Sequence, residues 1–146
     1  MPPVTPPVYR APMRARDRDL PPGAGAEFGL EHGLVAIGDA PHDAKAARML
    51  QRFTELDDGD FVWTRDADGW FHLGRISGPY RHDDGPVARA VGLPHVRPAR
   101  WLDRRFAPDA VPAAVADTFA RGGRNLQRIS DPAAAERTSE LWATYS

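Results

Sequence analysis

Aromatic rings and arginines gather around the segment "GDFVWTRDADGWFHLGRISGPYR", residues 59–81, and around the apolar run that follows it. Planar rings beside guanidinium groups suit a nucleobase that stacks in a pocket while its phosphates are held at the rim. The candidate side chains for such a pocket are Trp63, Thr64, Arg65, Tyr80, Arg81, His95 and Arg97. These residue types favour a planar anionic ligand.

The same rings have a structural interpretation. Large aromatic side chains dominate the cores of small domains, so Trp63, Trp70 and Trp101 are also candidates for core positions. Alternation along the extended segments leaves one face of each strand for the interior. A base-binding role requires that the ring of Trp63 and that of Tyr80 be open to solvent, and we expect this of both.

Catalytic and metal-binding motifs have less support. The phosphate motifs GxxxxGK[ST] and GxGxxG and the hydrolase motif GxSxG are missing, and the five histidines are scattered. A metal-dependent hydrolase or nuclease using His82, Asp83, Asp84 and His95 is the alternative that the residues allow. Two acids in a glycine-containing loop are typical of a solvated turn. A nuclease core of the PD-(D/E)xK type needs a lysine two residues after an acid in a strand, but the lysine of this chain, Lys45, lies on a predicted helix. We therefore expect no metal, no cofactor and no enzymatic activity.

A second glycine-rich stretch, "ARGGRN" at 120–125, has two interpretations. Its backbone N–H groups could bind a phosphate, or its two glycines could end the preceding helix. We favour the helix cap.

Charge is unevenly distributed along the 146 residues, although the net charge is only −1. Residues 9–18 carry four arginines and one acid, residues 19–60 nine acids and three bases, and residues 61–128 eleven arginines and seven acids. This asymmetry permits a local anion-binding face. The N-terminus lacks the hydrophobic stretch of a signal peptide and the chain has no cysteine, so we expect a cytoplasmic protein.

Periodicity and turn residues predict an α+β fold with a small, strongly bent sheet or barrel of about five to six strands. The predicted strands are 8–16, 34–39, 60–65, 70–78, 94–102 (interrupted by Pro98) and 124–130. The predicted helices are 25–33, 41–56, 108–123 and 131–145. We expect a proline-rich, extended leader at 1–7, one domain at 8–130, and a C-terminal helix at 131–146 that packs on that domain.

The stretch "RMLQRFTELDDGDFVWTRDADGWFHLGRISGPYR", followed by the strand "HVRPARWL", resembles PUA-like, EVE-like domains. Modules of this kind occur at the N-termini of some bacterial restriction endonucleases, and "GRNLQRI" at 123–129 is similar to their closing strand. The resemblance implies a PUA-like bent β-barrel with helices around it. It implies a base held between aromatic rings, with Trp63, Thr64 and Arg65 at the pocket edge, Tyr80 and Arg81 on the flanking turn, and Tyr9 on the first strand.

The sequence therefore predicts a nucleic-acid-binding module, a reader of modified bases in DNA that serves in defence or regulation. Nucleic acid is the expected partner, DNA rather than RNA, and any cleavage is expected from a separate nuclease or effector protein. Besides the hydrolase, a protein-binding adaptor is the other alternative. A cavity the size of one base favours reading, whereas a flat apolar patch favours a protein partner.

Overall fold

The computed structural model describes residues 5–15, 19–39, 43–123 and 126–146. Within these ranges the chain forms short strands and helices in alternation. The strands are β1 (Val8–Arg10), β2 (Leu34–Ile37), β3 (Phe61–Arg65), β4 (Phe71–Ile76), β5 (Arg81–His82), β6 (His95–Phe106) and β7 (Gln127–Arg128). The helices are α1 (Ala24–His32), α2 (Ala44–Glu55), α3 (Pro86–Val91), α4 (Ala113–Ala120) and α5 (Pro132–Tyr145), with a 3₁₀ turn at Pro108–Ala110.

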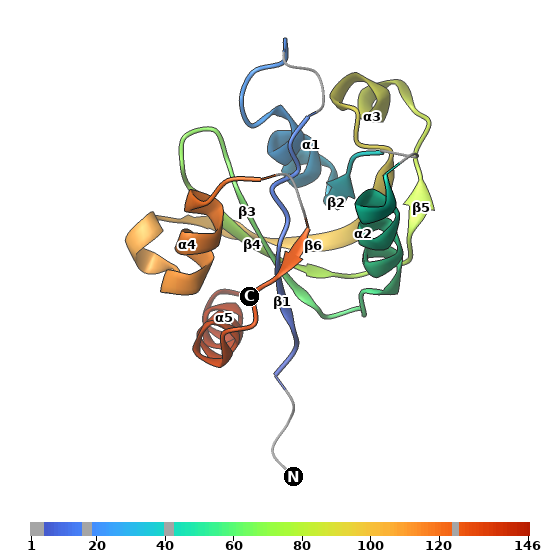
Figure 1. Ribbon diagram of the computed structural model, residues 1–146. Helices are drawn as coiled ribbons and strands as arrows, with labels where there is room; N and C mark the ends of the chain where they lie inside the picture. The colour runs from blue at the N-terminus through green and yellow to red at the C-terminus, as the bar shows by residue number, and fades with distance from the viewer. Residues whose placement is uncertain (1–4, 16–18, 40–42, 124–125) are drawn as a thin grey trace.

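The strands join into one mixed sheet in the order β2-β6-β4-β3-β1-β7, with β5 on the side of β6. β1 runs parallel to β3, and the other pairs are antiparallel. The sheet curls into a half-barrel (Figure 1). The protein is thus α+β with a bent sheet and helices packed around it, as the sequence predicts.

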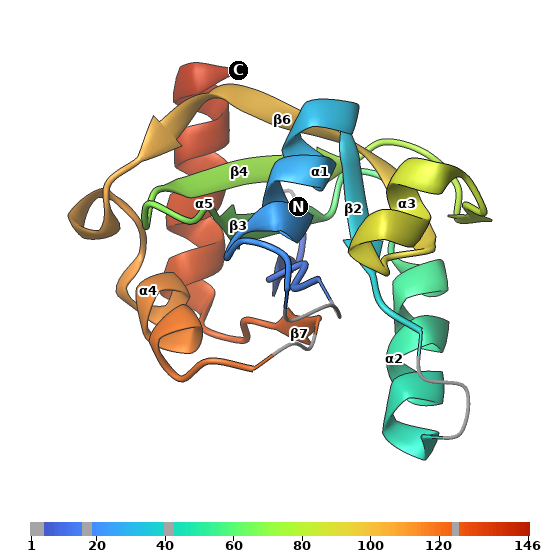
Figure 2. The ribbon, with the colours of Figure 1, turned by 90° about the horizontal axis from the view of Figure 1, so that it is seen from above.

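Helices cover both faces of the curled sheet. Figure 2 shows α4 and α5 at one end of the molecule, α2 and α3 at the other, and α1 between them. One core lies inside the curl, around Val62, Ile76 and Phe28 of α1. A second core lies under α4 and α5, around Phe61, Trp63 and Phe71. Because β3 contributes to both cores, neither of its faces is left to solvent.

Local chemistry explains the elements that the sequence predicts correctly. Gly33 ends α1 in the left-handed conformation at φ 65°, and its N–H donates to the carbonyl of Gly29. The carboxylate of Asp131 caps α5 by accepting from the N–H of Ala133. Leu141 and Trp142 then pack α5 on the sheet, although Tyr145 at its end is 42% exposed.

Several predicted boundaries are wrong. Pro98 does not interrupt its strand, because β6 continues through it. Pro98 is the last residue of β6 that pairs with β2, opposite Leu34, and from Ala99 onward β6 pairs with β4. The predicted helix at 108–123 begins only at Ala113, after the 3₁₀ turn and Pro112. Both β5 and α3 are missing from the prediction.

Parts of four predictions lie outside the described residues. These are positions 1–4 of the leader, position 16 of the strand predicted at 8–16, positions 41–42 of the helix predicted at 41–56, and positions 124–125 of the last strand. None of the helices in the described part of the chain combines the length and apolar character that a membrane crossing requires.

Candidate nucleic-acid interface

Trp63 is a core residue. Its side chain is 0% exposed, its ring meets Phe106 edge to face at 5.6 Å between centroids, and its indole N–H donates to the hydroxyl of Thr138 over 3.1 Å. The expectation that this ring is open to solvent is therefore wrong. The cause is α5, which covers this face of β3 and supplies the hydrogen-bond acceptor.

Four other predicted site residues are also buried: Tyr9, Thr64, His95 and Arg97. Tyr9 lies in the core inside the curl, and burial together with the carboxylate of Asp60 raises the pKa of its phenol. Thr64 is 0% exposed, and its hydroxyl has no hydrogen-bond partner in the described structure. Arg97 is buried, donating to the carbonyls of Gly78 and Phe53 over 2.7 and 2.9 Å. These side chains belong to the interior of the protein.

Tyr80 and His95 come together at the β5 end of the sheet. Their rings stack with centroids 5.9 Å apart, and the phenol oxygen lies 2.8 Å from His95 Nδ1. His95 Nε2 lies 3.3 Å from a carboxylate oxygen of Asp39. When Nε2 carries the proton and donates to Asp39, Nδ1 accepts from the Tyr80 hydroxyl. Tyr80 is half-buried, Arg81 is exposed and His95 is buried. The aromatic surface that this cluster offers to a ligand is therefore small.

In the loop beside this cluster, the acidic side chains interact with residues of the same loop. His82 Nδ1 lies 3.0 Å from Asp84, and the carboxylate of Asp83 accepts from the N–H of Gly85. His82 and His95 are cross-strand partners with ring centroids 5.3 Å apart. Across the described residues, no three histidine or acidic side chains are arranged to hold a metal ion.

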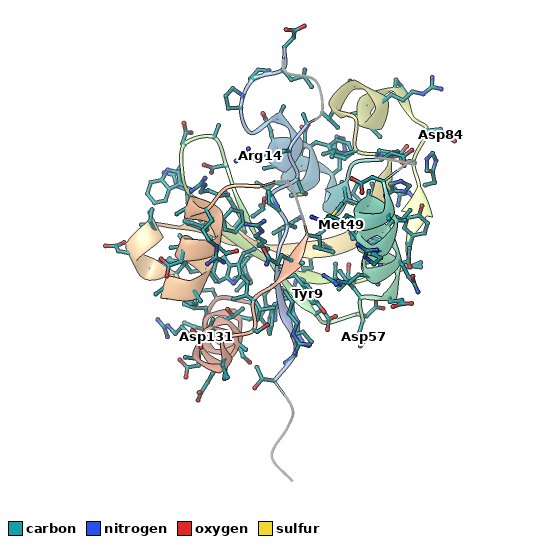
Figure 3. All side chains as sticks on the ribbon, in the orientation of Figure 1. Tyr9, Arg14, Met49, Asp57, Asp84 and Asp131 are labelled. Carbon is teal, nitrogen blue, oxygen red and sulfur yellow. The ribbon has the colours of Figure 1, made fainter. Side chains whose placement is uncertain are left out.

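A cavity of about 480 Å³ lies elsewhere, at the other end of the curled sheet. Four segments line it: the end of β1 with the chain that follows, the residues before α1, the end of β3 with the β3–β4 turn, and the end of α4. Arg10, Arg14 and Arg65 are its basic residues, and Met13, Leu20 and Phe119 contribute apolar surface. Figure 3 shows Arg14 beside α1, well apart in that view from Asp84 next to β5.

The end of α4 forms one wall of the cavity. Arg10 Nη1 donates to the carbonyls of Thr118 and Gly122 over 2.6 and 2.9 Å, so its guanidinium compensates the carbonyl end of the helix. Burial lowers the pKa of Arg10, and the neighbouring charges of Arg121 and Arg14 act in the same direction. A Cβ on Gly123 would lie 2.9 Å from Arg10 Nη2. The "ARGGRN" stretch is therefore both a helix end, as favoured, and part of a basic cavity; its residues 124–125 are not described.

Charge in the cavity is unbalanced. Its carboxylate, Asp66, accepts from the N–H groups of Asp68 and Trp70 and lies 2.8 Å from His72 Nε2. Arg65 instead lies over Phe119 at 5.7 Å, and neither it nor Arg14 has an ion pair within the described ranges. Among the described residues, the guanidinium groups of Arg14 and Arg65 at the border of the cavity are thus without an ion pair.

The predicted site residues divide into two groups that the fold keeps apart. Tyr9, Trp63, Thr64 and Arg65 lie on the adjacent strands β1 and β3, and among them Arg65 alone borders the cavity. Tyr80, Arg81, His95 and Arg97 lie around β5 and β6. Sequence analysis missed Arg10 and Arg14 as cavity residues. The excess of arginine in residues 9–18 was the available signal.

Comparison with known proteins adds a similarity of fold. No model of a known family matches this sequence, and no curated protein matches it. Among solved structures, the YTH domain of the Zygosaccharomyces rouxii MRB1 protein, crystallised with N6-methyladenosine RNA, is similar with a TM-score of 0.49 and 13% identity. The match covers 100% of this chain and 93% of that one. At this level of similarity, nothing about function passes from that domain to this chain.

Proposed function

We propose that this chain is a nucleic-acid-binding module that takes one nucleotide unit into the cavity bordered by Arg10, Arg14 and Arg65. One observation carries the proposal: a recess of about 480 Å³ has several guanidinium groups at its border and a carboxylate already engaged by its own turn. Sites for small ligands have volumes of about 300 to 1,000 Å³. Guanidinium groups bind phosphates through their N–H groups and stack on bases through their planes.

The proposal differs from the sequence-based one in the residues that contact the ligand. Arg65 is retained, Arg14 is added, and Trp63 is removed because it is buried. Arg10 holds the end of α4, so it shapes the cavity, whereas Arg14 is exposed and Arg65 half-buried. Arg14 and Arg65 are therefore the side chains that we assign to the ligand.

We extend the proposal to a modified base in DNA. Taking a base out of a duplex costs least when pairing is already weakened, so an altered base is the favoured occupant of a recess that takes single nucleotides. Such a module serves recognition in defence or regulation and leaves cleavage to a separate effector protein. We also propose that the chain belongs to the PUA-like superfamily, since a curled half-barrel with helices around it is the architecture that the resemblance implies.

The test is equilibrium binding to labelled single- and double-stranded DNA and RNA, each with and without a modified base, at two salt concentrations. Electrostatic contacts predict that affinity falls as salt rises. Arg14→Gln and Arg65→Gln should each weaken binding and reduce the salt slope by about one. Arg89→Gln is the matched control, because Arg89 is equally a surface arginine but lies on α3.

Absence of binding to every oligonucleotide at low salt would contradict the proposal. So would binding that both cavity variants leave unchanged. Tighter binding of a modified oligonucleotide than of its unmodified counterpart supports the extension to modified bases, and equal affinity counts against that extension alone.

A further inference from the structure

Trp70 differs from the other three tryptophans of the chain. Trp63 and Trp142 are buried in the core under α4 and α5, while Trp101 packs on the other core and donates its indole N–H to the carbonyl of Leu34. Trp70 is half-exposed and belongs to neither core. Its indole N–H has no hydrogen-bond acceptor in the parts of the chain that the structure describes. Part of this indole is therefore accessible to a ligand.

Arg105 covers one face of this indole. Its guanidinium carbon lies 4.2 Å from the ring centroid of Trp70, and Arg105 itself is exposed on β6. No ion pair occupies its guanidinium among the described residues. Stacking on an aromatic ring holds the planar guanidinium in place while its N–H donors stay open to solvent. The pair therefore offers a ring for stacking and positive charge for a phosphate.

Backbone hydrogen bonds fix the position of residue 70 at the end of the β3–β4 turn. Its N–H donates to the Asp66 carboxylate over 3.0 Å, and its carbonyl accepts from the N–H of Asp66 over 2.9 Å. His72 fixes the other oxygen of the same carboxylate at 2.8 Å. Trp70 follows directly on Gly69, which lines the cavity. A strand that leaves the cavity past the β3–β4 turn therefore passes residue 70, one residue beyond the cavity lining.

We propose that Trp70 and Arg105 form a stacking site for the nucleobase that neighbours the nucleotide in the cavity. The inference rests on the proposed function and specifies it: two successive nucleotides, one enclosed and one stacked, require a strand that is single or locally unpaired. Arg105 contacts the phosphate between or beside the two units. Base stacking on an aromatic side chain is tolerant of sequence, so this site contributes affinity for a strand and not choice of base.

Binding of a fluorescent oligothymidylate and of a sugar–phosphate chain of equal length without bases tests the inference. Trp70→Ala should weaken binding of oligothymidylate about tenfold. It should weaken binding of the base-free chain less, because that chain loses only the ring that positions Arg105. Trp70→Phe should retain most of the affinity, since a ring remains. Arg105→Gln should weaken binding of both chains. Val87→Ala is the control, because Val87 is another exposed apolar residue, 52% exposed on α3.

The outcomes separate this inference from the proposed function. If the wild type binds neither chain at low salt, the proposed function fails and the stacking site with it. If the wild type binds oligothymidylate and a folded Trp70→Ala variant binds it equally tightly, the stacking site is wrong while the proposed function stands. If Trp70→Ala does not fold, tryptophan fluorescence decides. Oligothymidylate should quench the emission of the wild type more than that of Trp70→Phe, and equal quenching would overturn the inference.

Discussion

Trp63 is held by full burial in the core under α4 and α5, by its edge-to-face contact with Phe106 and by one hydrogen bond to Thr138. Trp63→Ala should lower the free energy of unfolding by about 3 to 5 kcal/mol, the usual cost of removing a large aromatic side chain from a core. Trp63→Phe should cost less, because the ring volume is mostly kept. Urea denaturation monitored by circular dichroism measures both changes. A Trp63→Ala protein that is as stable as the wild type would contradict the core assignment.

Asp66 gives the β3–β4 turn a pH dependence. Burial tends to raise the pKa of its carboxyl, but hydrogen bonds from His72 and Trp70 outweigh burial, and the pKa lies below its ordinary value of 3.8. A depressed pKa means that the carboxylate stabilises the fold above pH 3.8, and that this contribution is lost as the pH falls below 3.8 through the folded-state pKa.

Replacement of Asp66 by alanine should therefore lower the free energy of unfolding at neutral pH by about 1 to 3 kcal/mol. The difference from the wild type should narrow as the pH falls below 3.8. Asp68→Ala is the control within the same turn, because the Asp68 side chain is exposed. Urea unfolding across this pH range is the measurement, and a difference that stays constant with pH would show that the carboxylate charge has no part in it.

Gly74 shows how closely neighbouring elements approach on the inner face of the sheet. A Cβ at this position would lie 2.6 Å from Cε3 of Trp101, and the Trp101 ring is fixed by its hydrogen bond to Leu34. Gly74→Ala should therefore destabilise the protein by about 1 to 3 kcal/mol, as overpacking does.

A double-mutant cycle identifies the cause of that destabilisation. In a Trp101→Leu background the ring that meets the new methyl group is gone, so Gly74→Ala should cost clearly less than it does in the wild type. Thermal and urea unfolding of the four proteins give the coupling. Equal costs in both backgrounds would mean that the ring is not what excludes a side chain at this position.

The elements that sequence predicted well are those with local chemistry of their own. The β3–β4 hairpin follows from "DADG", whose first aspartate binds the N–H groups of its own turn, and α5 follows from the Asp131 cap. Helix α3 has six residues and too few turns to show a period. The two-residue strand β5 exists only because β6 lies beside it, which no local pattern could indicate.

Prediction of the site was limited by the arrangement of the helices. Alternation correctly separates the two faces of β3, but it cannot tell that helices bury both of them. The strand pattern around Trp63 and Trp70 does not tell which of the two rings is buried. The position of α5, which covers Trp63 and accepts its hydrogen bond, distinguishes the buried ring from the half-exposed one. Arg65 was predicted as a site residue and does line the cavity. Whether it binds a nucleotide stays a prediction.

At the scale of the whole molecule, arginines from distant parts of the sequence meet at one place. Arg10 and Arg65, the last residues of β1 and β3, border the cavity together with Arg14, whereas Asp57 lies on the opposite lower side (Figure 3). A nearly neutral protein can thus present a local positive field to an anionic strand. Binding should weaken steeply with salt even though the net charge is −1.

Amide chemical shifts during titration with an unlabelled single-stranded oligonucleotide test the central claim most directly. If the cavity takes a nucleotide, the resonances of Gly69, Gly122 and Gly123, which line it, should shift with ligand concentration, while those of α3 stay in place. Shifts confined to the surroundings of Tyr80 and His95, with the cavity glycines unmoved, would contradict the claim.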